Sequence, residues 1–352
     1  MTSTVHGSTT AELDALRELT NDLFGSITRP HLHSPQTTLP YSSEAWDLLG
    51  ESGLTLLTTP ESAGGSGGGI TEAALMLDRT GYHALPAPLF ETDLLASWLL
   101  GLHGTDASSA PMTAVQVDWS PGDLRAGKIV LNRVPWGQIA SDILVAGDRF
   151  VGRIRTADAK IEPVGDLVGE HYADVSVSVE ALEVVPTSTD TRSEYLTRGA
   201  WARSEQICGA LERILDLGIA HVTERHQFGR PIGKFQAVQE LISRSAGLVT
   251  TAKAATAHAA AVVAQEGFDA DSSRIAVSIA KIQAGRAATV VSRDIHQAHG
   301  AIGFTLDHQL RHFTTRALAW NRDFGTSTQW SKELGRRALG SGMSVWEFAV
   351  AH

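Results

Sequence analysis

The chain has 352 residues, of which 43% are hydrophobic, so it can bury a large core divided over two or three packed units. Its formal net charge of −10 speaks against a broad basic face for nucleic acid, but it allows a local basic pocket for a phosphate ligand. The single cysteine, Cys208, excludes a disulfide within the chain, and its apolar neighbours predict a buried helix face. Residues 1–10 lack the apolar core of a signal peptide, and no apolar run approaches the ~20 residues of a membrane span, so we expect a cytoplasmic protein without membrane contact.

Residues 1–109 show helical periodicity broken by loops, which predicts an N-terminal helical domain. One of its helices has Ser42 or Ser43 available as an N-cap. The Gly-rich stretch 60–69 lacks the Gly-Lys-Ser/Thr of a phosphate-binding loop and does not follow a clear strand, so a flexible or tightly turning surface loop is favoured over a nucleotide site. The expected helices cover residues 11–24, 43–52, 71–82 and 91–102.

Residues 110–188 change to a period of two, which predicts a small, mostly antiparallel β domain. Val175, Val177 and Val179 form the plainest alternating run. Gly147-Asp148 separates two apolar runs and predicts a hairpin.

Residues 189–352 return to helical periodicity and are rich in alanine, which suits close helix–helix contact in a bundle. An order of helical domain, β domain and helical bundle is therefore readable from periodicity alone. The fold class is mainly α with a central β domain.

The fourteen histidines form no metal-ligand pattern. Two pairs lie three or four residues apart, but no cysteine or glutamate completes a zinc site at a familiar spacing, and we predict no metal site. These pairs are His296 with His299, and His308 with His312. No Gly-x-Ser-x-Gly elbow supports Ser-His-Asp chemistry.

The strongest local motif joins two expected helices at residues 224–236. A helical hairpin with a turn at Gly229 is the purely structural interpretation. The same turn gathers a guanidinium, an aromatic ring and two amides, which suit an anionic, aromatic ligand. In that interpretation Arg225 contacts phosphate, Phe228 stacks and Gln236 forms hydrogen bonds.

A second motif, residues 297–304, ends a helix with glycines at positions 300 and 303. A helix C-cap followed by a turn is the structural interpretation. The alternative is that small residues let a phosphate or a sugar approach the backbone.

Together these motifs resemble the acyl-CoA dehydrogenase family, and the resemblance covers most of the chain. The family's Arg-x-x-Phe-Gly pattern, with a glutamine eight residues after the phenylalanine, is matched by Arg225, Phe228, Gly229 and Gln236. Its Gln-x-x-Gly-(Gly/Ala)-x-Gly-Phe pattern is matched by Gln297, Gly300, Ala301, Gly303 and Phe304. The N-terminal region keeps further family positions in order, at Trp46, Gly53, Pro60-Glu61, Gly64-Gly65, Gly81 and Pro86-x-Pro88. The resemblance implies a helical domain at 1–109, a β-barrel-like domain at 110–188 and a four-helix bundle at 189–352.

The resemblance also implies FAD-dependent dehydrogenation between Cα and Cβ of an acyl-CoA thioester. In the family a carboxylate removes the α-proton while the β-hydrogen leaves as hydride to flavin N5. The adenosine and pyrophosphate of one subunit's FAD are reached by the two motifs of its neighbour. The cofactor-binding residues implied in this chain are Arg225, Gln227, Phe228, Gln236, Gln297, Gly300 and Ala301.

The family's catalytic carboxylate has no counterpart in this chain. Its usual position, 27 residues after Gln297, holds Phe324, which cannot accept a proton. The position used by other members, 30 residues before Gly229, holds Gly199. Three acidic residues lie nearby without falling on either position: Glu194, Glu205 and Asp323. We therefore predict no catalytic residue in this chain.

The middle domain also lacks the family's flavin-facing segments. The Leu-Thr-Glu-Pro…Gly-Ser-Asp segment is absent, with only residues 120–123 near its place, and so is the Lys-x-Trp-Ile-(Thr/Ser)-Asn strand. Residues 141–145 keep the family's Ala-Asp-x-x-Val strand. This loss resembles the smaller subunit of actinobacterial heteromeric α2β2 acyl-CoA dehydrogenases, many of which act on CoA thioesters of steroid side chains.

The resemblance then implies that a homologous larger subunit supplies the catalytic glutamate. It also implies an acyl-CoA substrate and an electron-transfer flavoprotein as the acceptor. Two alternatives stay open: a homotetrameric dehydrogenase with a displaced base such as Glu205 or Asp323, and a non-catalytic scaffold of the same fold. Nucleic-acid binding by such a scaffold is disfavoured by the net charge of −10.

Overall fold

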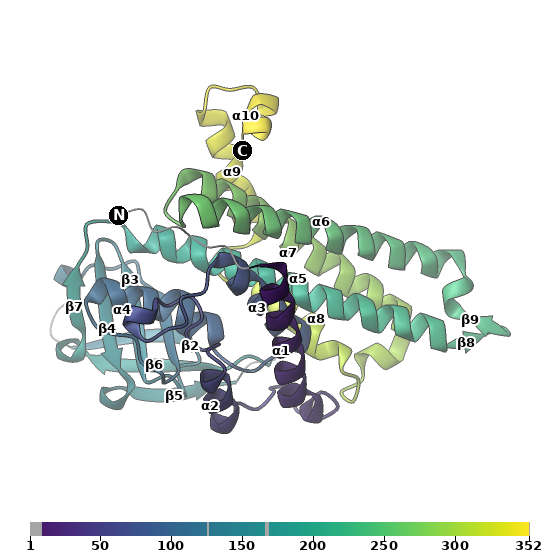
Figure 1. Ribbon diagram of the computed structural model, residues 1–352, viewed down its shortest axis with the longest axis horizontal. Coiled ribbons are helices and arrows are strands. Elements are labelled where there is room, and N and C mark those ends of the chain that lie inside the picture. Colours follow the sequence, from purple (N-terminus) through teal and green to yellow (C-terminus); the bar gives the residue numbers. More distant parts are fainter. Residues whose placement is uncertain (1–8, 125–126, 166–168, 352) are drawn as a thin grey trace. The chain divides into compact units, whose positions relative to one another are not determined.

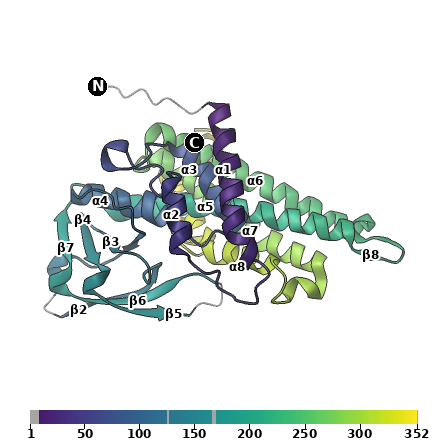
Figure 2. The same ribbon diagram turned by 60° about the horizontal axis from the view of Figure 1, so that its bottom comes forward.

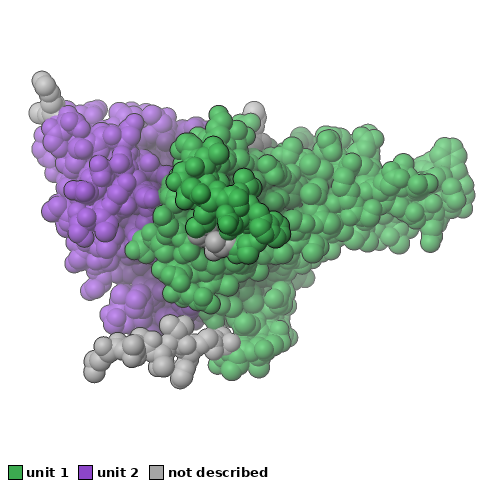
Figure 3. Space-filling view, turned by 90° about the horizontal axis from the view of Figure 1, so that it is seen from above, with its two compact units in different colours: residues 1–37, 70–85, 200–352 green, residues 38–69, 86–199 purple. Residues whose placement is uncertain are grey.

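The computed structural model describes residues 9–124, 127–165 and 169–351. Helices account for 61% of the chain, with a small central sheet region, as the fold class predicts. The chain forms two compact units, each built from separate stretches of sequence (Figure 3). Unit 1 comprises residues 1–37, 70–85 and 200–352, and unit 2 comprises residues 38–69 and 86–199. The three-domain division at 1–109, 110–188 and 189–352 remains a prediction.

Unit 1 consists of helices from both ends of the chain (Figure 1). Two long helices, α6 and α7, pack against each other along an interface rich in buried alanine, as the composition predicts. Residues 200–224 of α5 also belong to this unit. Its helices are α1 (Thr10–Thr28), α3 (Ile70–His83), α5 (Thr191–Glu224), α6 (Gln236–Glu266), α7 (Asp271–His299), α8 (Leu310–Trp320), α9 (Ser327–Gly340) and α10 (Val345–Ala351). Short 3-10 turns follow α1 at η1 (Arg29–His31), precede α6 at η7 (Ile232–Lys234) and follow α7 at η8 (Gly300–Phe304).

Unit 2 contains two sheets with a shared core. One has the strand order β1-β3-β4-β7 and the other the order β2-β6-β5. Among the described strands, β1 and β3 are parallel and the remaining pairs of these two sheets are antiparallel. The bounds are β1 (Met112–Gln116), β2 (Lys128–Pro135), β3 (Asp142–Gly147), β4 (Phe150–Arg155), β5 (Lys160–Val164), β6 (Tyr172–Ser178) and β7 (Glu183–Pro186).

The predicted hairpin and alternating strand are both present in these sheets. Strands β3 and β4 pair from Asp142–Arg155 to Gly147–Phe150. Val175 and Val177 of β6 point into a core shared with Ile143 and Val145 of β3, which explains their alternation with polar residues.

Helical segments of unit 2 connect and cover these sheets. The side chain of Ser42 accepts a hydrogen bond from the amide of Ala45 and caps α2, so this one of the two predicted caps is used. Segment 91–102, expected as one α-helix, is instead a π-helix, η3, followed by α4. These elements are α2 (Ser43–Glu51), η2 (Glu61–Ala63), η3 (Glu91–Ser97), α4 (Trp98–His103), η4 (Pro121–Asp123), η5 (Thr156–Asp158) and η6 (Val179–Ala181).

The Gly-rich stretch 60–69 is a tight turn packed on its own preceding segment. Gly64 adopts a left-handed conformation with φ of 86°. A Cβ on Gly65 would lie 2.1 Å from the carbonyl oxygen of Thr59. The glycines therefore serve close backbone packing, in agreement with the turn expected from the sequence.

Helices α3 and α5 meet with their backbones in direct contact inside unit 1. A Cβ on Gly81 would lie 1.9 Å from the carbonyl oxygen of Gln206, and one on Gly209 would lie 1.7 Å from that of Asp78. Only glycine fits at either position, because the obstructing atoms belong to helical backbone that cannot move aside.

A cluster of charged groups forms beside this crossing. Arg79 pairs with Asp78 and, at 2.9 Å, with Glu212, while Lys253 of α6 pairs with Glu212 and, at 3.2 Å, with Asp78. Glu205 lies one turn before Gly209 on α5 and is only 5% exposed. Burial, reinforced by the charge of Asp78, raises the pKa of Glu205 to about 8.

No helix among the described residues is long and apolar enough to cross a membrane.

Replacing Gly209 by alanine should cost about 3 kcal/mol or more of unfolding free energy, because the new methyl group collides with the backbone of α3. Gly247→Ala is the matched control, since that α6 glycine has open space around it and should gain about 0.5–1 kcal/mol. Urea unfolding of both variants measures the difference. Equal stabilities would contradict the close crossing.

Glu205→Gln should remove a pH dependence of stability. A carboxyl group whose folded-state pKa lies near 8, above its unfolded value of 4.5, binds a proton more tightly when folded, so stability falls as pH rises through this window. The wild-type slope should reach about 1.4 kcal/mol per pH unit between about pH 7 and 8, above the range in which the buried histidines titrate. The glutamine variant should be flatter, whereas Glu18→Gln on the exposed face of α1 should retain the wild-type slope.

Candidate functional site

The first predicted motif forms a two-stranded hairpin beyond the end of α5 (Figures 1 and 2). Strand β8 (His226–Gln227) pairs with β9 (Arg230–Pro231), and α6 then begins at Gln236 as expected. Phe228 at the tip has a left-handed φ of 52° and is 92% exposed. A large aromatic in this conformation carries a conformational cost and gains no burial within the chain, which points to a ligand or partner as its contact.

The polar side chains of this hairpin also face solvent. Arg225 and Gln227 are exposed, and within the described part of the chain the guanidinium of Arg225 forms no hydrogen bond or ion pair. The backbone of Arg225 closes the hairpin by accepting a hydrogen bond from Ile232 at 2.8 Å. Gln236 is exposed and donates to Glu240 at 3.2 Å.

The second predicted motif ends α7. Gln297 lies exposed on its last turn, and Gly300 stops the helix with a φ of 66° and a hydrogen bond from its amide to the carbonyl of His296. The space where a Cβ of Gly300 would lie is open, and Ala301 is exposed. Phe304 at the end of η8 is 72% exposed and stacks on His296.

A pair of stacked histidines brings the two motifs to the same end of the bundle. His221 lies one turn before Arg225 on α5, and His299 lies directly before Gly300 on α7. Their ring centroids are 4.3 Å apart with planes 17° from parallel. All seven residues predicted to contact a cofactor are exposed and belong to unit 1.

These residues fit one end of an anionic, aromatic cofactor such as FAD. The unpaired guanidinium of Arg225 suits a pyrophosphate, and the exposed ring of Phe228 suits an aromatic base. Gln297 offers an amide, and the open space at Gly300 allows close backbone approach.

The family's usual base position lies in the turn between α8 and α9. Phe324 is half-buried there with a left-handed φ of 53°, and its carbonyl accepts a hydrogen bond from Trp330 at 2.9 Å. Buried Lys281 donates to the carbonyl of Trp320 at 2.6 Å, and a Cβ on Gly285 would lie 1.9 Å from Asn321. The turn is tightly held, yet its residue 324 offers no proton acceptor.

The three neighbouring acids are engaged in structural contacts. Glu194 pairs with Arg198 at 2.7 Å, and Asp323 pairs with Arg203 at 3.0 Å. Glu205 is buried in the charged cluster beside α3, with a pKa near 8 that keeps it protonated at neutral pH. None is placed as an exposed carboxylate base.

The segments that remain of the family's β-domain pattern have structural partners. Ser120 and Asp123 form a capping box around η4. Residues 142–145 lie in β3, and their apolar side chains are buried in the sheet core. Asp142 forms an ion pair with Arg153 at 2.7 Å.

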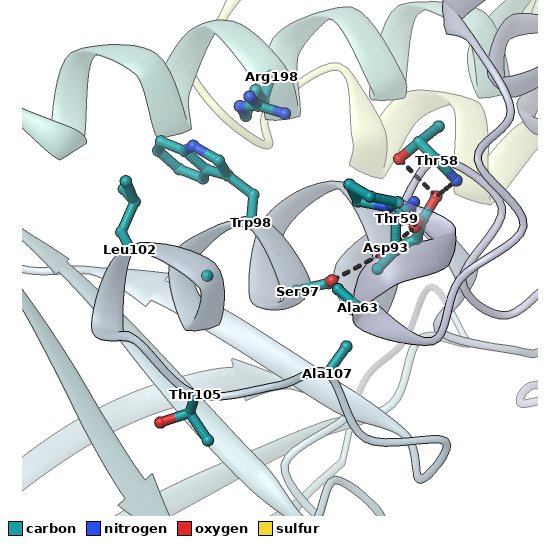
Figure 4. A pocket seen from close by; sticks show the side chains of 12 residues that line it. Thr58, Thr59, Ala63, Asp93, Ser97, Trp98, Leu102, Thr105, Ala107 and Arg198 are labelled. Atoms are coloured by element: carbon teal, nitrogen blue, oxygen red, sulfur yellow. Dashed lines mark hydrogen bonds between the residues drawn. The ribbon is translucent and has the colours of Figure 1, made fainter.

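Sequence reasoning missed a cavity of about 410 Å³ inside unit 2 (Figure 4). One wall is the π-helix η3, whose Asp93 accepts four hydrogen bonds, from the amides and hydroxyls of Thr58 and Thr59. Burial raises the pKa of Asp93. Ser97 completes this wall with a hydroxyl 2.7 Å from that of Thr59. The polar groups here satisfy one another and fix the loop to the helix.

The opposite wall of the cavity is formed by Arg198, whose guanidinium lies over the ring of Trp98. The guanidinium of Arg198 lies 4.4 Å from the ring centroid of Trp98 and is paired with Glu194. Leu102 borders the same side (Figure 4). None of the seven predicted cofactor residues lines this cavity. No sequence signal marks it, because its walls come from distant segments.

Across the described residues, no group of three or more histidine, cysteine, aspartate or glutamate side chains is arranged to hold a metal ion.

The sequence matches two family models. The acyl-CoA dehydrogenase N-terminal domain matches residues 10–110, and the acyl-CoA dehydrogenase C-terminal domain matches residues 191–338. The acyl-CoA dehydrogenase IpdE2 of Mycolicibacterium smegmatis is 30% identical over 315 residues, covering 86% of this chain and 92% of the relative. Its namesake in Mycobacterium tuberculosis is 32% identical over 280 residues, covering 79% and 81%.

Solved structures share the fold. The ChsE4-ChsE5 complex from Mycobacterium tuberculosis matches with a TM-score of 0.82 at 22% identity, covering 96% of this chain and 99% of that one. A variant of the Tcur3481-Tcur3483 steroid ACAD matches with a TM-score of 0.80 at 22% identity, covering 95% and 99%. From the family models and the sequence relatives, the chain belongs to the acyl-CoA dehydrogenase family, whose members are FAD-dependent.

Proposed function

We propose that this chain is a subunit of a heteromeric acyl-CoA dehydrogenase in which it supplies the adenine and pyrophosphate side of a shared FAD site. A homologous larger subunit supplies the catalytic glutamate. One observation carries the proposal: the seven cofactor residues are exposed at one end of the bundle, while the two base positions hold Phe324 and Gly199. A chain with this distribution can serve a flavin whose reactive end belongs to another subunit.

The predicted cofactor residues of this chain have binding roles in this proposal. Arg225 pairs with the pyrophosphate, Phe228 stacks on the adenine side, and Gln297 and Gly300 contact the phosphates or the ribose. When bound, FAD would supply the acceptor for the hydride that leaves Cβ of the acyl-CoA. The residues of this chain orient the cofactor and do not move the proton.

Names of the similar structures support a heteromer and a substrate class. One is a complex of two differently named chains, and another is described as a steroid ACAD. We therefore propose an α2β2 assembly acting on a CoA thioester of a steroid side chain, with an electron-transfer flavoprotein as the acceptor.

The two alternatives have less support. A homotetramer with a displaced base needs a free carboxylate, but Asp323 is paired with Arg203 and Glu205 is buried and protonated at neutral pH. A scaffold would not need Arg225 and Gln297 exposed at the same end of the bundle.

Flavin stoichiometry tests the proposal. Absorbance should show a colourless chain when it is purified alone, and one FAD per heterodimer when it is co-expressed with a larger homologue encoded by a neighbouring gene. One FAD per chain for the protein alone would contradict the shared site and favour the homotetramer.

Arg225→Ala should weaken the FAD affinity of the co-purified complex by about tenfold or more, because a charge-assisted contact to phosphate contributes about 1.5–3 kcal/mol. Arg17→Ala, which removes an exposed arginine from α1, is the control and should leave the dissociation constant for FAD unchanged. An unchanged dissociation constant in the Arg225 variant would count against the pyrophosphate role.

A further inference from the structure

Five histidines gather where α5, α7 and α8 come together at the motif end of unit 1. They lie on three elements and on the loop between two of them. They are His221 of α5, His296 and His299 of α7, His308 of the loop after η8, and His312 of α8.

Three of the five rings contact one another directly. His221 stacks on His299 at 4.3 Å, and His308 meets the edge of His299 at 5.0 Å. His296 stacks on Phe304 at 4.5 Å and places its Nε2 3.0 Å from the hydroxyl of Thr314. The ends of two helices and the following loop are thus joined through imidazole contacts.

One hydrogen bond of the cluster requires a neutral ring. Nδ1 of His308 accepts a hydrogen bond from the amide of Leu310 at 3.2 Å, so this nitrogen carries no proton. Nδ1 of His299 donates to the carbonyl of Ile295 at 2.8 Å, so Nε2 is the nitrogen at which the neutral His299 ring takes up a proton. Nδ1 of His296 and Nε2 of His312 are buried without a hydrogen-bond partner among the described residues.

The charged groups around the cluster are mostly cationic. From α5, Arg225 and Glu224 act on His221 with opposite signs. From α8, Arg311 and Arg316 act on His312, and His33 after η1 acts on both His308 and His312. The carboxylate of Asp307 lies in the loop and acts on Arg311. Protonation of the cluster therefore adds positive charge where the surrounding charges are already mostly positive.

Burial keeps these rings neutral in the folded chain. Desolvation lowers the pKa of His299 to about 4 and that of His312 to about 3. It also lowers the pKa values of His221, His296 and His308, with Arg225 adding to the effect at His221 and neighbouring histidines at the other two. A base with a depressed folded-state pKa stabilises the fold above its unfolded value of 6.5, and this contribution is lost as pH falls from there toward the folded value.

We propose that the His221–His299 stack is a positioning joint, which holds the β8–β9 hairpin and η8 in one fixed arrangement and opens when its rings are protonated. His221 precedes the hairpin by one turn, and His299 immediately precedes η8. The consequence for FAD rests on the function proposed above: acid should release the cofactor by separating the two segments that contact it. The joint itself is a property of this chain alone.

Amide hydrogen exchange of the full-length chain tests the joint. Exchange is measured at pH 7.5 and pH 5.0, corrected for the intrinsic pH dependence, for peptides covering residues 222–236 and 300–310. A shift of the His299 pKa from 6.5 to about 4 predicts roughly 30-fold more frequent opening at pH 5.0. Peptides from the middle of α6 should show no such change.

Three variants separate positioning from simple packing. His299→Phe keeps a stackable ring that cannot titrate, so it should stay protected at pH 7.5 and lose most of the acid response. His299→Ala should exchange faster in both segments at both pH values. His258→Phe replaces an exposed histidine of α6 and should behave as the wild type. The joint is overturned if amide exchange in His299→Phe increases at pH 5.0 as much as in the wild type, or if exchange in the wild type does not increase at pH 5.0.

A second readout distinguishes the joint from the proposed function. In the co-purified complex, lowering the pH from 7.5 to 5.0 should release FAD from the wild type and less from His299→Phe. A normal exchange response in a complex that never contains FAD would preserve the joint and overturn the cofactor role. If FAD binding depends on Arg225 but amide exchange does not change with pH, the cofactor role would be preserved and the joint overturned.

Discussion

The backbone contact between α3 and α5 is the constraint on which the rest of unit 1 depends. Gly81 and Gly209 leave no room for a side chain between the helices, so α3 lies directly on the face of α5. This closeness places Asp78 and Arg79 beside Glu205 and Glu212, where α6 adds Lys253 to the same cluster. The acid that the sequence offers as a displaced base is thereby enclosed in the bundle, and its role becomes structural.

At the end of the helices that carries the β8–β9 hairpin, the polar groups are exposed instead of buried. There the chain exposes an arginine, amides and an aromatic ring, and the ring belongs to Phe228, whose backbone is left-handed. The acids near the base positions are thus engaged within the fold, while the seven residues predicted to bind a cofactor are exposed to solvent. The stacked histidines lie directly behind the exposed segments, since His221 precedes the hairpin and His299 precedes η8.

Much of this architecture follows from local sequence. Periodicity located the helices and the β3–β4 hairpin, because each depends on neighbours close in the chain. The π-helix at Glu91–Ser97 was not predicted, since its hydrogen bonding is tied to a buried Asp93 held by threonines more than thirty residues away. The parallel pairing of β1 with β3, the cavity beside Trp98 and the histidine stack also depend on contacts between distant segments. The family resemblance identified the seven predicted cofactor residues, the structure adds that all of them are exposed, and their binding roles remain predictions.

The discontinuity of unit 1 has a consequence for the order in which the chain is made. Unit 2 is complete in the sequence at residue 199, but α3 packs on α5 and α6, which extend to Glu266. At typical elongation rates, the ribosome needs roughly 10–40 s to pass from residue 85 to residue 266. During that interval α1 and α3 are already synthesised while the helices that bury their apolar faces are not. The apolar faces of these early helices therefore stay uncovered by α5 and α6 until that length of chain has been made.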